Sequence, residues 1–154
     1  MRRAIALLML VTASAVACGS VSHAAADVPS PVAIPSPSPS PTGLQFPLNG
    51  IHTSASGKII VMATPTSMTI ELIITGLASN SSHISHVHLG SCQQQGGILF
   101  ALNQVVADGT GAADTPTSLQ VKYPPASGHW YVVVHSGPDM QGTNATYLMC
   151  GNLF

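Results

Sequence analysis

Histidines on an extended segment give this sequence its most specific chemistry. His86 and His88 are separated by one residue in the stretch 83–90. Alternate side chains of a β-strand point to one face, so the two imidazoles project together, about 7 Å apart along the backbone. His135, which closes the apolar run 130–134, supplies a third imidazole. Three imidazoles without a carboxylate or thiolate suit copper or zinc, so we predict a metal site at His86, His88 and His135. The alternative is that they are ordinary surface or hydrogen-bonded strand residues.

Two cysteines stand near the two histidine segments. Cys92 follows the first and Cys150 the second. In an oxidising compartment the expected state is a disulfide between them, and the long loop that it closes would stabilise the fold by a few kcal/mol. Both thiols could instead ligate metal, although neither has a Cys-x-x-Cys spacing. His129 shares the strand face of His135 but lies about 20 Å away along a regular strand, so we leave it out of the site.

The first 17 residues predict an export signal. Two arginines open the chain after Met1, and the apolar segment 4–11 is too short to span a bilayer. Small residues precede Cys18, in an arrangement that resembles a bacterial lipobox. Cys18 would then be the lipidated first residue of a lipoprotein anchored in the cell membrane, on its extracytoplasmic side. Ordinary secretion, with cleavage near residues 24–26, is the alternative.

Residues 18–42 predict a spacer and residues 43–154 a single folded domain. Proline and serine alternate through most of the spacer, a composition that favours an extended polyproline II tether. The domain is poor in charge, and Lys58 and Lys122 are its only lysines, with no arginine. Nucleic-acid binding depends on cations that neutralise phosphates, so nucleic acid is excluded as a partner.

Runs rich in β-branched residues, bounded by Gly, Pro and Asp turns, predict an all-β domain. Apolar side chains occupy every second position of residues 68–75, the pattern of a strand with one face on a core. Expected strands are 58–64, 68–75, one beginning at about His83, 97–102, 118–121, 129–135 and 146–153. No segment has a convincing helical period. The predicted fold is an antiparallel Greek-key β-sandwich or flattened barrel.

The order of these motifs resembles the Cu/Zn superoxide dismutases. The stretch 83–88, preceded by the Gly-Leu turn at 76–77, is similar to the copper-site strand of that family. Residues 132–135 resemble its last copper-ligand segment, and 149–151 its terminal Ala-Cys-Gly. The resemblance covers most of residues 57–154. It implies a dismutase-like β-sandwich with copper ligands His86, His88 and His135, a structural histidine His83, and a disulfide between Cys92 and Cys150.

The chain also departs from that family. No histidine lies between Leu89 and Gly128, so the bridging histidine and the zinc loop have no counterpart, and zinc is not expected. Tyr147 occupies the position of the arginine that guides superoxide. With these departures, the resemblance implies a site that holds copper alone. The small ligand of the protein would be superoxide, which reacts at the copper, or copper itself.

A second resemblance is to CHRD domains. It rests on the His-x-His strand, on the Gly-Gly-Ile-Leu-Phe segment 96–100 and on the aromatic-Val-x-Val-His segment that ends at His135. The short connection between the two histidine segments is similar to that of CHRD domains. Two functions therefore follow from the sequence. One is an exported, lipid-anchored, dismutase-like copper protein, and the other is a non-catalytic CHRD-like adhesion or interaction module whose histidines are structural.

Overall fold

A computed structural model of the protein describes residues 43–154. The interpretations of residues 1–17 as an export signal, of Cys18 as a lipidation site and of residues 18–42 as a tether lie outside the described residues and stay predictions. Among the residues that are described, no helix is long and apolar enough to cross a membrane.

The described chain is built almost entirely of antiparallel strands. They are β1 (Leu44–Gly50), β2 (Ser56–Ala63), β3 (Met68–Thr75), β4 (Ser82–His83), β5 (Ser85–Gly90), β6 (Gln95–Ala101), β7 (Val105–Val106), β8 (Ala113–Leu119), β9 (Trp130–His135) and β10 (Tyr147–Asn152). A single 3-10 turn, η1 (Gly142–Ala145), lies in the connection between β9 and β10. The predicted all-β class is confirmed.

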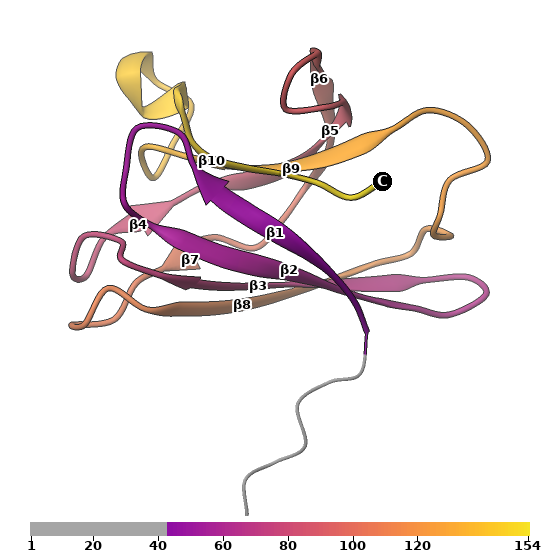
Figure 1. The fold of residues 1–154 in the computed structure, drawn as a ribbon, viewed down its shortest axis with the longest axis horizontal. Helices are drawn as coiled ribbons and strands as arrows, with labels where there is room; N and C mark the ends of the chain where they lie inside the picture. The colour runs from indigo at the N-terminus through magenta and orange to yellow at the C-terminus, as the bar shows by residue number, and fades with distance from the viewer. Residues whose placement is uncertain (1–42) are drawn as a thin grey trace, which may run out of the picture. The chain divides into compact units, whose positions relative to one another are not determined.

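Eight of the strands form one sheet that curls on itself. Their order is β6-β5-β9-β10-β1-β2-β3-β8, and β4 pairs separately with β7. Figure 1 shows β2, β3 and β8 on one side, β5, β9 and β10 on the other, and β1 crossing between them. Neighbours such as β5 and β9, or β1 and β10, are far apart in sequence, as in Greek-key β-sandwiches.

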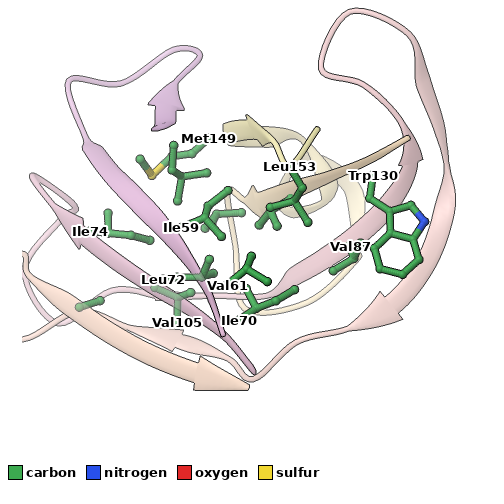
Figure 2. Packing of buried hydrophobic residues seen from close by; sticks show 14 of the residues in the cluster. Ile59, Val61, Ile70, Leu72, Ile74, Val87, Val105, Trp130, Met149 and Leu153 are labelled. Atoms are coloured by element: carbon green, nitrogen blue, oxygen red, sulfur yellow. The ribbon is translucent and has the colours of Figure 1, made fainter. Parts of the chain in front are cut away.

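The core fills the space between the two sides of the curled sheet. In β3, every second side chain, from Met68 to Ile74, is buried, as the apolar alternation predicts. Figure 2 shows Ile70, Leu72 and Ile74 of β3 in one cluster with side chains from β2, β5, β9 and β10. Burying each such aliphatic side chain stabilises the fold by about 1.5–3 kcal/mol, so this cluster fixes which face of each strand points inward.

Strand β9 is covered on both of its faces. Trp130, Val132 and Val134 point into the main core, while Tyr131 and Val133 belong to a smaller cluster on the other face. All six residues of β9 are buried. Because His135 follows this alternation, it lies on the outer face with Tyr131 and Val133, and it is nevertheless fully buried.

Two strand predictions were wrong in detail. The expected strand from His83 is divided at Ile84: His83 belongs to β4, which pairs with β7, and β5 begins at Ser85. The strand expected at 118–121 is β8, and it begins five residues earlier. Pro116 lies within β8 and hid it from sequence reasoning, although proline is tolerated there because β8 is an edge strand.

The sequence analysis missed β1. It contains Pro47 and only one buried side chain, Leu48, so it has no apolar alternation. Along its length β1 pairs with β2, but it pairs with β10 only at Asn49 and Gly50. The stretch that carries Pro47 therefore has one partner strand and tolerates the missing N–H group.

The two faces of β3 offer a direct test of this register. Ile70 is fully buried in the core, whereas Ile73 is half-buried on the opposite face. We expect Ile70→Ala to lower the free energy of unfolding by about 2–5 kcal/mol, because it leaves a cavity. Ile73→Ala removes the same atoms and should cost much less. Urea unfolding of both variants measures this, and equal losses would contradict the register.

Candidate metal centre

Pairing between β5 and β9 brings the three predicted ligands together. His86 pairs with Val133 and His88 with Tyr131, which are residues of the outer face of β9. His135 follows two residues after Val133 and donates its backbone N–H to Ile84 O at 2.9 Å. Since diagonal neighbours on one sheet face are within reach of long side chains, His86, His88 and His135 converge. Their ring centroids are 5.1–6.0 Å apart.

His135 is held in one tautomer by its surroundings. Its Nδ1 lies 2.7 Å from the carbonyl oxygen of Ala145, which can only accept, so Nδ1 carries the proton. The other ring nitrogen, Nε2, is therefore an acceptor. It lies 3.1 Å from Nδ1 of His86, which must donate to it when no metal is present. The two nitrogens thus share one proton. A metal ion can take its place when His86 changes to its other neutral tautomer, with that proton on its own Nε2.

His88 leaves a buried nitrogen without a partner. Its Nδ1 donates to the carbonyl oxygen of Gly96 at 3.0 Å, which makes Nε2 the free acceptor. Nε2 is buried and has no hydrogen-bond partner among the described residues. A buried polar atom without a hydrogen-bond partner lowers the stability of the fold by about 1–3 kcal/mol. An unpartnered nitrogen beside two other histidines is therefore what we expect of a metal ligand.

Gly96 reaches His88 because the β5–β6 ladder is irregular there. Register shifts occur on both sides of His88 in this pairing. Bulges re-aim side chains and leave backbone groups free of the ladder. Gly96 also lies so close to the backbone of Leu89 that an added Cβ would clash with the Leu89 carbonyl oxygen. Glycine is thus required at this position for the contact that orients His88.

The three ligand nitrogens have the spacing of a metal site. One nitrogen from each of His86, His88 and His135 lies within 4.8 Å of the other two. Ligands that share one ion at about 2 Å are at most about 4 Å apart, so the widest separation must contract slightly when an ion binds. His86 is partly exposed, while His88 and His135 are buried, so His86 marks the side of the site nearest to solvent.

Burial favours the neutral form of two of these imidazoles, His86 and His135. It lowers the pKa of His86 from 6.5 to about 4, with smaller contributions from His135 and His88. Burial also lowers the pKa of His135. Metal ions bind the neutral imidazole, so both side chains are ready to ligate at neutral pH without first losing a proton to water.

The two cysteines form a disulfide on the same outer face. Cys92 and Cys150 are joined, with a Cα–Cα distance of 6.0 Å. This is the disulfide that the sequence predicts for a protein in an oxidising compartment. The alternative of two thiolate ligands is therefore excluded in this structure. The disulfide packs with Tyr131, Val133 and Tyr147, and we call these five residues the outer-face cluster.

His83 and His129, the other histidines that the sequence analysis considered, are not part of the three-histidine group. His83 is buried, with Nδ1 2.9 Å from the carbonyl oxygen of His135 and Nε2 2.8 Å from Ser81 Oγ. This contact links the short strand β4 to the end of β9. His129 is exposed, precedes β9 and has Nδ1 3.2 Å from the carbonyl oxygen of Phe154. Neither is among the residues with metal-ligand spacing.

Comparison with known protein families matches residues 40–142 to the CHRD domain. This chain belongs to the CHRD family. The match contains β1 to β9 and all three histidines, and it ends before β10, which carries Cys150 and Tyr147. No curated protein matches the sequence. Of the two resemblances seen in the sequence, the one to CHRD domains is thus confirmed. The one to Cu/Zn superoxide dismutases stays a prediction.

Sequence reasoning missed the residues that support the histidines. Gly96 and Ala145 act through backbone carbonyl oxygens, which carry no side-chain signature. Tyr131 was read only as part of an apolar run. Tyr131, Val133 and His135 alternate along β9 and so share its outer face. This alternation was the signal that could have placed Tyr131 beside the histidines.

Stability of the metal-free CHRD domain should fall in mild acid. Below pH 6.5 the unfolded chain takes up a proton on His86, but the folded chain resists protonation until about pH 4. The free energy of unfolding must therefore decrease as the pH falls through this window. His86→Gln removes the group, so its decrease should be shallower. Urea unfolding at pH 7 and pH 4.5 measures both, and identical decreases would contradict the assignment.

Proposed function

We propose that this protein is a non-catalytic CHRD module that binds one copper ion through His86, His88 and His135. The observation that carries the proposal is the buried, unpartnered Nε2 of His88, facing a pair of imidazoles that share one proton. The ligand atoms would be Nδ1 of His86 and Nε2 of the other two. Once bound, the ion supplies a centre that can change between Cu(I) and Cu(II).

The donor set favours copper over other divalent ions. Three neutral imidazoles contribute no charge, and the site has no carboxylate oxygen for a hard cation such as Mg²⁺ or Ca²⁺. At nitrogen sites of this kind copper binds more tightly than zinc in the usual order of stability. Within residues 43–154, the one group with metal-ligand spacing is that of His86, His88 and His135.

The surroundings of the site favour binding over turnover. Fast capture of an anion such as superoxide depends on a nearby cation. The lysines of the described chain are Lys58, on β2 in the opposite side of the sheet, and Lys122, beyond β8. Tyr147 instead packs edge-on against His88 and His135. Burial raises the pKa of its phenol above the ordinary value, so it stays neutral.

The proposal includes a location outside the cytoplasm. Three sequence features support it: the basic and apolar start of the chain, the lipobox-like arrangement at Cys18, and the Pro/Ser spacer 18–42. The disulfide between Cys92 and Cys150 is consistent with an oxidising compartment. On this view lipid on Cys18 anchors the module to the cell membrane, and the spacer holds it away from the surface.

Copper loading tests the proposed function. After loading and desalting, we expect one tightly held copper per chain, with nitrogen hyperfine structure in its Cu(II) EPR spectrum. The double variant His86→Ala/His88→Ala should lose both. His129→Ala is the matched control, because it removes an exposed imidazole outside the site and should retain the copper.

The same samples separate the two functional hypotheses. Absence of retained copper in the wild type would overturn the metal site and leave a CHRD interaction module with structural histidines. Copper-loaded protein that dismutates superoxide would instead favour the dismutase-like hypothesis over the non-catalytic one. We expect binding without dismutation.

A further inference from the structure

Two tyrosines of the outer-face cluster stand directly behind the histidines. Tyr131 is fully buried, and its ring lies 5.1 Å from that of His88 at an angle of 35°. Tyr147 is half-buried and directs its ring edge-on to His88, at 5.6 Å, and to His135, at 5.4 Å. Together they form a wall against two of the three proposed ligands.

Their hydroxyl groups join a closed hydrogen-bond network around His88. The Gly96 N–H donates to the Tyr131 hydroxyl at 3.2 Å. The Tyr131 and Tyr147 hydroxyls are 3.1 Å apart, and the Tyr147 hydroxyl lies 3.4 Å from Nδ1 of His88. Nδ1 in turn donates to the Gly96 carbonyl oxygen. Gly96 is therefore bound through both of its backbone groups, one by Tyr131 and the other by His88.

This network favours one tautomer of His88. When Tyr131 donates to Tyr147, the Tyr147 oxygen is a second acceptor for the Nδ1–H of His88, beside the Gly96 carbonyl oxygen. With the proton on Nε2 instead, the Gly96 carbonyl oxygen would keep only the longer contact from the Tyr131 hydroxyl, at 3.5 Å, and Nε2–H would point into a buried space without an acceptor. The tautomer that keeps the shortest of these hydrogen bonds, from Nδ1–H to the Gly96 carbonyl oxygen at 3.0 Å, is the one that directs the Nε2 lone pair at His86 and His135.

We propose that Tyr147, oriented by Tyr131, is a positioning residue of the copper centre, which holds His88 in its ligating tautomer. This inference rests on the proposed function and adds to it a residue outside the histidine set. Groups that hold the remote nitrogen of a ligating histidine fix its orientation and raise its basicity. Tyr147 does so from β10, whereas the three histidines come from β5 and β9.

Removal of one hydroxyl tests the proposal. Tyr147→Phe keeps the ring against His88 and His135 but deletes the oxygen. We expect copper affinity, measured by competition with a chromophoric chelator, to fall about tenfold, the lower end of the range for such supporting contacts. The nitrogen hyperfine pattern of bound Cu(II) should change as well. A purely structural role of the hydroxyl would leave that pattern unaltered.

A double-mutant cycle tests the part of Tyr131. Tyr131→Phe breaks the contacts to both Gly96 and Tyr147, so it should produce the same spectral change. If the two hydroxyls act through one network, Tyr131→Phe/Tyr147→Phe should cost no more than the larger single effect. Additive losses would contradict the shared network.

Tyr123→Phe is the matched control. It also deletes a hydroxyl with a hydrogen bond, from Tyr123 to the Leu153 carbonyl oxygen at 2.9 Å, but on the core side beside Trp130. It should destabilise the fold without altering the copper spectrum. If wild-type protein binds copper and Tyr147→Phe behaves like Tyr123→Phe, the positioning role is overturned while the proposed function stands. If the wild type binds no copper, both fail.

Discussion

Pairing of β5 with β9 is the constraint on which the rest of the structure depends. Val87 on β5 and Val132 and Val134 on β9 must face the core, because their burial supplies much of its stabilisation. Once they do, strand alternation places His86, His88 and His135 on the outer face. A register slip of one residue in β5 would turn its histidines into the core and Val87 outward. The hydrophobic core thus sets the position of the polar site.

Two connections between strands then cover the outer face. The β9–β10 connection brings the Ala145 carbonyl oxygen to His135, and the turn after β5, tied by the disulfide at Cys92, brings Gly96 to His88. Each contact fixes a tautomer, and each leaves a nitrogen lone pair aimed at the same small volume. This is the physical reason to regard the cluster as a binding site within a CHRD domain rather than as three histidines that pack together.

The features that could be predicted from the sequence are those that depend on the type of side chain at a position. The alternation in residues 68–75, the pairing of Cys92 with Cys150 and the grouping of His86, His88 and His135 are of this kind. Prediction from the sequence failed for features that depend on backbone groups or on partners far away in the sequence. Strand β1 is stabilised by β2 despite Pro47, and the contacts of Gly96 lie where the register of the β5–β6 ladder shifts on both sides of His88.

Diffraction with anomalous scattering at the copper edge, from crystals of copper-loaded protein, tests the central claim most directly. The account predicts a single strong peak about 2 Å from Nδ1 of His86, Nε2 of His88 and Nε2 of His135. It also predicts that the distance between Nδ1 of His88 and the Gly96 carbonyl oxygen is retained. Copper elsewhere on the chain, or ligation through Nδ1 of His88, would contradict it.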